Sequence, residues 1–386
     1  MTGQVDPDLL ERVRRRVGTQ PGPPTAAAVA AALRLEDGGL RGDVGALLAA
    51  LQREIVGAGP LTGLLADPAV TDVLVNGADQ VWVDRGAGLA LTPVRFADDT
   101  AVRRLAQRLA APSGRRLDDA QPWVDARLPD GTRLHAVLAP VAVDGTCLSL
   151  RIPRRRGFTL AELAAAGSLP PDGVTLVQAL VASRHAFVVT GGTGTGKTTL
   201  LSALLSLVDP ADRVLLVEDS GELRPALPHV VRLEARPPNV EGAGQVTLRD
   251  LVRQALRMRP DRLVVGEVRG AEVVDLLAAL NTGHEGGCGT LHANSSRDVP
   301  ARLEALAAAA GLERSALHSQ LASGLKLAVH LVRDRTTGRR RVGEVSVLSR
   351  GSDGFVRAQP AWSWDGHGSA GTPGPAVGAL PVVAAG

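Results

Sequence analysis

The chain has 386 residues, of which 45% are hydrophobic and 2% aromatic, and its formal net charge is +3. This is enough apolar sequence for two globular domains, and the charge balance excludes a globally polycationic, nucleic-acid-binding surface. Two cysteines, Cys147 and Cys288, give no disulfide framework, and the sequence shows neither a signal-peptide pattern nor an apolar run of about 18 residues, so we expect a cytoplasmic location.

The first 55 residues alternate helix-forming stretches with breaks. Residues 9–17 are charged and amphipathic, prolines interrupt them at 21–24, and residues 25–35 and 44–55 are further helix candidates. We therefore expect a helical extension over residues 1–55 that serves as a packing or docking element.

Residues 56–152 change character to short alternating segments. Asn76-Gly77, a dipeptide typical of hairpin turns, lies between the alternating residues 70–75 and 80–84. A helix is expected at 102–109, and further strands at 124–127, 133–138 and 147–152. These elements predict a small α+β domain, followed by an arginine-rich linker over residues 153–159.

Residues 160–350 alternate strands and helices, which is typical of a mostly parallel α/β sheet. Strands are expected at 186–189, 213–217, 263–265 and 289–292, helices at 247–258 and 298–310, and a closing hairpin at 329–348. Residues 351–386 are rich in Gly, Ala, Pro and Ser, and their composition predicts a flexible tail.

A glycine-rich turn joins the strand at 186–189 to an amphipathic helix. It spells G-x-x-x-x-G-K-T from Gly191 to Thr198, a phosphate-binding loop in its expected strand–turn–helix context. Lys197, one of only two lysines, would reach the β- and γ-phosphates, and the Thr198 hydroxyl would ligate Mg²⁺. The residues expected to contact nucleotide here are Gly192, Thr193, Gly194, Thr195, Gly196, Lys197, Thr198 and Thr199.

Acidic residues follow two of the predicted strands. Glu218, Asp219 and Glu222 come after residues 213–217, and Glu267 comes after 263–265. Ligands of such sheets bind at the carboxyl ends of strands, so these carboxylates are candidates for holding Mg²⁺ through water or aligning an attacking water. The alternatives are a helix cap with a charged turn for the first group, and an ordinary surface acid for Glu267.

Two histidines lie in the glycine-rich stretch after residue 281. His284, Cys288 and His292 have a four-residue spacing that suggests zinc, but the intervening glycines break any helix that would align them. A γ-phosphate sensor is favoured over metal, with ordinary histidines in a turn as the alternative. Residues 249, 253 and 257 are arginines on one helical face, which is either solvated or aimed at acidic loops or a neighbour's nucleotide.

Four blocks now stand in order: GGTGTGKTT, VEDSGEL, RMRPDRLVVGEVRG and TGHEGGCGTLHANS. Together they resemble the ATPase superfamily of type II and type IV secretion, most closely its tight-adherence pilus (Tad/CpaF-type) branch and the related conjugal-transfer ATPases. The segments PLTGLLADPAVTDVLVNGADQVWVDR and VDARLPDGTRLHAVLAPVAVDG resemble that branch's N-terminal domain. The absence of the tetracysteine zinc insertion of the type II branch favours the pilus or type IV branch.

The resemblance implies a RecA-like P-loop NTPase domain preceded by the smaller α+β domain and the helical extension. It implies a cytoplasmic homohexameric ring that hydrolyses ATP with Mg²⁺ between its two domains. Domain motion about the linker would act on an inner-membrane platform protein to drive pilin assembly or substrate export, and peripheral association with the membrane is compatible with this. No stable nucleic-acid partner is expected.

The resemblance also implies roles for individual residues. Glu222 matches the acid that orients water, and Glu267 matches the Walker-B acid, so these two and Lys197 are the expected catalytic residues. His284 and His292 match a histidine box. Arginines of the N-terminal domain reach the phosphates in this family, and Arg133 and Arg151 are the candidates here, with Arg127 as a less favoured alternative.

Three other functions remain open at this stage. A RecA-like DNA translocase or conjugal DNA-transfer ATPase shares the core, although few aromatic residues are available for base stacking. A GTPase would need a base-reading N-K-x-D motif, which neither lysine provides. A non-hydrolysing structural subunit would not need intact Lys197 and Glu267.

Overall fold

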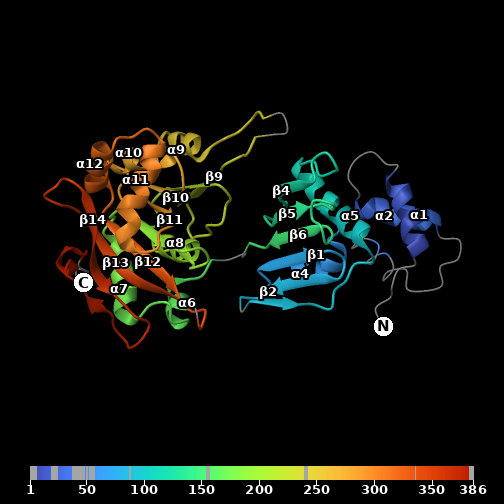
Figure 1. Ribbon diagram of the computed structural model, residues 1–386, viewed down its shortest axis with the longest axis horizontal. Helices are drawn as coiled ribbons and strands as arrows, with labels where there is room; N and C mark the ends of the chain where they lie inside the picture. The colour runs from blue at the N-terminus through green and yellow to red at the C-terminus, as the bar shows by residue number, and fades with distance from the viewer. Residues whose placement is uncertain are drawn as a thin grey trace. The chain divides into compact units, whose positions relative to one another are not determined.

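The computed structural model describes residues 7–18, 25–36, 48, 51, 57–86, 88–153, 157–238, 242–334 and 336–381. The chain divides into two compact units, Met1–Arg154 and Arg155–Gly386 (Figure 1). The expected helix at 44–55 lies outside the described residues except for Leu48 and Leu51, and so does the centre of the expected linker. In the described ranges, no helix is both long and apolar enough to span a bilayer.

The chain begins with two short helices, α1 (Pro7–Gly18) and α2 (Ala26–Glu36). Leu9, Val13 and Val17 recur every four residues, so they lie on one face of α1, and they share a small core with α2. The described arginines of α1 are exposed. The apolar faces of the two helices therefore pack together in this core.

The first unit contains a six-stranded antiparallel sheet in the order β3-β2-β1-β6-β5-β4. Its elements are η1 (Gly59–Leu61), α4 (Thr62–Ala66), β1 (Asp72–Asn76), β2 (Gln80–Asp84), β3 (Leu89–Leu91), α5 (Asp99–Ala110), η2 (Ala111–Ser113), β4 (Trp123–Arg127), β5 (Arg133–Val137) and β6 (Cys147–Arg151). Alternate residues such as Val73, Val75 and Val81 are buried in a core shared with α5, because successive side chains of a strand point to opposite faces.

The second unit is built on a nine-stranded sheet in the order β15-β14-β13-β12-β7-β11-β10-β8-β9. Its strands are β7 (Phe187–Gly191), β8 (Val214–Glu218), β9 (Val230–Glu234), β10 (Arg262–Val268), β11 (Cys288–Leu291), β12 (Leu327–Arg333), β13 (Arg340–Arg350), β14 (Val356–Ser363) and β15 (Thr372–Pro373). The strands from β12 to β9 run parallel, and β13 to β15 add antiparallel partners at one side.

Helices cover both faces of this sheet. They are α6 (Leu160–Ala165), α7 (Pro171–Ala182), α8 (Lys197–Leu205), α9 (Leu248–Leu256), α10 (Glu272–Leu280), α11 (Val299–Ala309) and α12 (Arg314–Gly324), with 3₁₀ turns η3 (Ser296–Asp298) and η4 (Val377–Ala379). One core contains residues of α9 to α12, and the other contains residues of α6 to α8. Every residue of β7 and β8 is buried, which explains why these strands are continuous apolar runs in the sequence.

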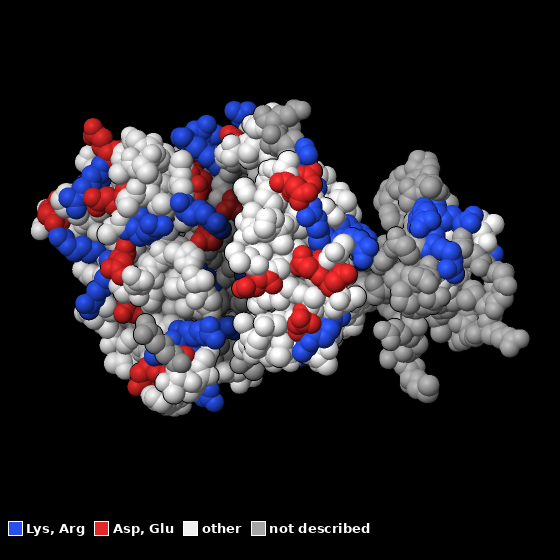
Figure 2. Space-filling model, turned by 45° about the vertical axis from the view of Figure 1, so that its right-hand side comes forward, with Lys and Arg blue, Asp and Glu red and all other residues white. Residues whose placement is uncertain are grey.

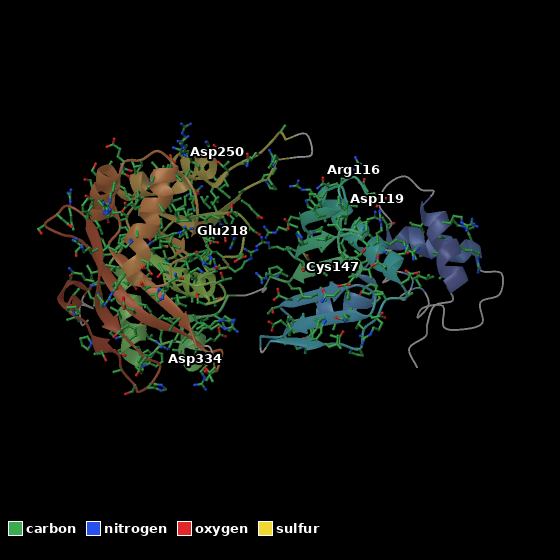
Figure 3. All side chains as sticks on the ribbon, in the orientation of Figure 1. Arg116, Asp119, Cys147, Glu218, Asp250 and Asp334 are labelled. Carbon is green, nitrogen blue, oxygen red and sulfur yellow. The ribbon has the colours of Figure 1, made fainter. Side chains whose placement is uncertain are left out.

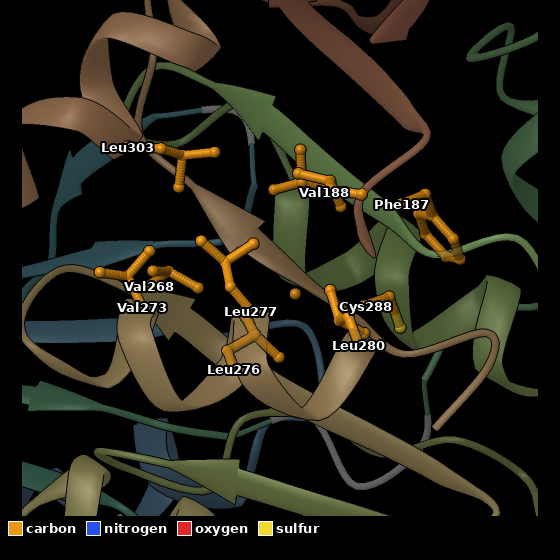
Figure 4. Close-up of a pocket in the computed structure, with 11 residues that line it drawn as sticks. Phe187, Val188, Val268, Val273, Leu276, Leu277, Leu280, Cys288 and Leu303 are labelled. Atoms are coloured by element: carbon orange, nitrogen blue, oxygen red, sulfur yellow. The ribbon is translucent and has the colours of Figure 1, made fainter. Parts of the chain in front are cut away.

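A small apolar cavity of about 20 Å³ lies between this sheet and α10 (Figure 4). Cys288, Leu277 and Leu280 line it. Burial raises the pKa of the Cys288 thiol to about 12, so the sulfur stays protonated and behaves as a core atom. Among the described residues, no group of His, Cys, Asp or Glu side chains is arranged to hold a metal ion.

The prediction of a flexible tail over 351–386 is wrong for the described part of that segment. β14 pairs with β13, and β15 pairs with β14. The Trp362 indole N–H donates to Asp172 Oδ2 at 2.8 Å, and the Gly371 N–H donates to the same oxygen at 2.9 Å. These contacts hold the C-terminal segment to α7. The Gly- and Pro-rich composition of the segment gives no sign of them.

Candidate functional site

The predicted site residues of the second unit converge because of the strand direction. β7, β11, β10 and β8 run parallel, so the residues that follow them meet at one edge of the sheet. The phosphate-binding loop follows β7, Glu218 ends β8 (Figure 3), Glu267 lies near the end of β10, and His292 follows β11. The sheet therefore gathers at one edge groups that are separated by up to about 100 residues in the sequence.

The loop after β7 has the backbone form that the glycine pattern predicts. Gly191 has φ +147°, and a Cβ there would lie 2.6 Å from the Leu331 carbonyl oxygen. Gly196 has φ +94° and directly precedes α8, which begins at Lys197. The first N–H groups of a helix have no intrahelical acceptors, so the start of α8 presents donors and partial positive charge to an anion.

Lys197 lies within this loop and is 7% exposed. Its Nζ donates to Gly191 O at 3.1 Å and to Gly192 O at 2.9 Å, and lies 3.4 Å from His292 Nδ1. Burial lowers the pKa of Lys197, while the nearby Glu267 and Glu222 carboxylates oppose that shift. Glu222 and Glu267 thus both lie close enough for their charge to act on this ammonium.

A chain of charged contacts continues from Lys197 across the edge of the sheet. His292 Nε2 lies 2.9 Å from Glu267 Oε1. Arg269 joins Glu267 to Asp219, with 2.7 Å to Glu267 Oε2 and 2.9 Å to Asp219 Oδ2. A neutral imidazole that is protonated at Nε2 satisfies both neighbours, and burial and Lys197 lower the pKa of His292 accordingly. Sequence reasoning missed Arg269.

Glu218 differs from the other acids because it faces inward. It is 3% exposed, and its Oε1 accepts the N–H groups of Glu222 at 2.8 Å and Leu223 at 2.9 Å. A Cβ on Gly266 would lie 2.7 Å from Glu218 Cγ, so the glycine before Glu267 makes room for this carboxylate. Glu218 therefore shapes the turn that carries Glu222.

Glu218→Gln should change how stability depends on pH. Burial raises the pKa of Glu218 above its ordinary 4.5, so the folded state favours the protonated form. That contribution is complete below the unfolded pKa and is lost as the pH rises through the folded pKa, by about 1.4 kcal/mol for each unit between them. In urea unfolding from pH 4 to pH 8, the parent should lose stability relative to the variant as the pH rises. A constant difference would contradict this.

The structure does not bring His284 to the phosphate-binding loop. His284 precedes β11 and its Nδ1 lies 3.2 Å from Ala279 O, at the end of α10. β11 runs from there to the other edge of the sheet, about 13 Å away at 3.3 Å per residue. The strand expected at 289–292 is β11 (Cys288–Leu291), and it separates His284 from His292. Of these two histidines, His292 is therefore the one at the site edge.

The arginine candidates of the first unit lie in a row across its sheet. Arg127, Arg133 and Arg151 are successive cross-strand partners, and Arg151 faces Asp72, with 2.9 Å between Arg151 Nε and Asp72 Oδ1. Side chains paired in this way share one face of a sheet. The row concentrates positive charge within the first unit, and its action on phosphate remains a proposal.

The arginines of α9 have a structural partner. Arg249 Nε lies 2.7 Å and Arg253 Nε 2.8 Å from the two oxygens of Asp275 on α10. Two of the three arginines on the predicted helical face therefore tie α9 to α10.

Comparisons with known proteins agree with the resemblance seen in the motifs. The sequence model of the type II/IV secretion system protein family matches residues 54–363. A putative conjugal transfer protein of Mycobacterium tuberculosis is 59% identical over 329 residues, which cover 84% of this chain and 93% of that protein.

Two solved structures share the fold. The Legionella pneumophila ATPase DotB is 21% identical with a TM-score of 0.52, over 81% of this chain and 79% of that chain. The pilus retraction motor PilT with bound ADP is 19% identical with a TM-score of 0.55, over 76% and 83%. With the sheet order and the phosphate-binding loop, these matches confirm the predicted RecA-like α/β fold, and the chain belongs to the type II/IV secretion system protein family of ATPases.

Proposed function

We propose that this chain is the ATP-hydrolysing motor of a pilus or a type IV secretion machine. The observation that carries the proposal is the edge of the second sheet, where a phosphate-binding loop, a buried lysine and two linked acids meet. Membership of the secretion family and the ADP bound to the pilus motor PilT support the same conclusion.

The residues of this edge fit a magnesium nucleotide. Lys197 and the N–H groups at the start of α8 would hold the β- and γ-phosphates. Mg²⁺ in such sites keeps phosphate oxygens and water as its main ligands, so the Thr198 hydroxyl and a more distant Glu267 suffice without a cluster of carboxylates. Both Glu267 oxygens are already in contact with His292 and Arg269, which favours contact with the metal through water.

The catalytic roles divide between the two acidic turns. Bound ATP supplies the phosphoryl group, and Mg²⁺ supplies charge that stabilises its transfer. Glu222 orients the attacking water, and Glu218 holds the turn that carries Glu222. His292 contacts Lys197 and is proposed to sense the γ-phosphate through it. Arg133 and Arg151 of the first unit are proposed to neutralise charge on the phosphates, and Asp219 to keep Arg269 in place.

The mechanical role rests on the family. Closure of the two units on ATP and their release after hydrolysis would move a membrane platform protein, from within a homohexameric cytoplasmic ring. The M. tuberculosis relative's name supports conjugal DNA transfer as a second candidate. Over the second unit in Figure 2, basic and acidic side chains are interspersed, which does not favour a nucleic-acid track there. Strong stimulation of ATP hydrolysis by DNA would favour the second candidate.

Glu267→Gln should separate binding from hydrolysis. The substitution removes the charge that faces His292 and Arg269, so we expect phosphate release from ATP to fall by about 10²-fold while nucleotide binding remains. Glu285→Gln is the matched control, because Glu285 is exposed beyond the opposite end of β11. Phosphate release by Glu267→Gln at the parental rate would contradict the proposed role.

A further inference from the structure

Residues 339–341 are three consecutive arginines, and the structure gives two of them different partners. Arg341 donates to the Trp364 carbonyl oxygen and so holds the C-terminal segment. Arg340, the residue before it and the first of β13, points elsewhere because neighbouring side chains of a strand alternate in direction. Its Nε donates to Gly194 O, in the middle of the phosphate-binding loop, at 2.9 Å.

The contact between Arg340 and the loop extends beyond this hydrogen bond. A Cβ on Gly196 would lie 3.4 Å from Arg340 Cδ, so the stem of the side chain crosses the glycine that precedes α8. A Cβ on Gly194 would lie 3.8 Å from Nη1 of Arg333, so a second guanidinium also lies beside the loop. Two arginines of the β12–β13 hairpin thus border the loop from within the same unit.

The pairing of these arginines is itself informative. Arg333 and Arg340 are directly opposite each other in the β12–β13 ladder. Like charges in that position destabilise a pair of strands, and an anion between or beside them removes the cost. Among the described residues, the structure records no carboxylate within ion-pair distance of either guanidinium.

The nearest acid of the hairpin is already in use. Asp334 (Figure 3) accepts the N–H groups of Thr336 at 2.8 Å and Thr337 at 2.6 Å, which shapes the turn between the two strands. These bonds lower the pKa of Asp334, so it stays ionised for the turn. The arginine pair therefore keeps its charge directed toward the loop.

We propose that Arg340, with Arg333 opposite it, binds the phosphate chain of the nucleotide from the β12–β13 hairpin of the same protomer. This inference rests on the proposed function, because it needs a nucleotide in the loop. It is separate from the arginine row of the first unit, since both residues belong to the unit that carries the loop. The backbone N–H groups of such a loop cradle the α- and β-phosphates, which ADP and ATP share, so the arginine contact should act on both nucleotides.

The test is a fluorescence titration of the full chain with a ribose-labelled ADP, which measures binding without turnover. Arg340→Ala should weaken binding about 10-fold, since a hydrogen bond to a charged group contributes about this factor. Arg340→Lys should recover part of the loss, and raising the salt concentration should shrink the difference. Arg339→Ala is the matched control: within the described part of the chain no side-chain bond of Arg339 is recorded, and binding should stay at the parental level.

A further variant separates contact with nucleotide from support of the loop. Arg340→Gln keeps a donor for Gly194 O and removes the charge, so it should bind as weakly as Arg340→Ala. Parental binding by Arg340→Gln would overturn the proposal, because it would leave only a role in holding the loop. If the parent binds and Lys197→Ala does not, while Arg340→Ala equals the parent, the inference alone fails. If the parent does not bind the labelled ADP, the proposed function fails as well.

Discussion

Lys197→Ala should lower ATP hydrolysis by at least about 10²-fold, because removal of one preorganised donor from a phosphoryl-transfer site has an effect of that size. The Lys197 residue is 7% exposed, and its ammonium donates to two carbonyl oxygens of its own loop. It also contacts His292, through which it is linked to Glu267. Removal of the Lys197 side chain therefore takes away the positive charge that would face the phosphates. It also removes the contact with His292.

The control for Lys197 is the other lysine of the chain. Lys326 Nζ donates to Ala322 O at 2.8 Å, at the end of α12. Lys326→Ala should therefore keep the parental rate of phosphate release. Because the two acceptors of Lys197 lie in a loop at the edge of the sheet, Lys197→Ala should unfold in urea close to the parental midpoint. Hydrolysis by folded Lys197→Ala at the parental rate would refute the assignment of the site.

Asp212→Ala should lower the free energy of unfolding by about 3–5 kcal/mol, because it leaves a buried charge without its partner. Arg262 is 3% exposed, and its Nε lies 3.0 Å from Asp212 Oδ2. Arg184 Nη2 lies 3.2 Å from the other oxygen. Arg184 and Asp212 precede β7 and β8, and Arg262 begins β10, so all three lie at the edge of the sheet opposite the phosphate-binding loop.

Urea unfolding followed by circular dichroism measures this effect, with Asp209→Ala as the control. Asp209 is exposed and accepts the N–H of Ala211 at 2.9 Å, so its removal should cost little. The double variant Asp212→Ala with Arg262→Met should recover part of the loss, since no unpaired charge then remains at Arg262. Equal stabilities of Asp212→Ala and the parent would show that Arg262 is neutralised in another way.

The centre of the site could be predicted because its signals are local. The glycine spacing of 191–198 encodes the loop directly, and Glu267 follows an apolar strand whose neighbours in the sheet are parallel. The strand-end rule then places these residues at one edge without knowledge of any contact. What the sequence could not distinguish was which acid of the 218–222 turn faces inward, because burial depends on the packing of Gly266.

The parts that failed depend on contacts between distant residues. The Trp362 indole donates to Asp172, which lies 190 positions earlier. The composition of residues 351–386 carries no information about so distant a partner. β9 was not predicted, because its residues are half-buried or exposed and do not form a continuous apolar run. In the sequence, Arg269 and Arg340 are indistinguishable from ordinary surface charges. Their contacts appear only when the end of β10 and the start of β13 are placed in the fold.

The order of the strands has a consequence for synthesis of the protein. The last strand of the first unit's sheet to be synthesised is β6, which ends at Arg151. That unit can therefore fold while the rest of the chain is still being synthesised. β7 has to wait for β12, because its register pairs Phe187 with Leu327. Until then one side of a fully buried strand is open, and the nascent polypeptide exposes an unpaired edge of the kind that molecular chaperones shield.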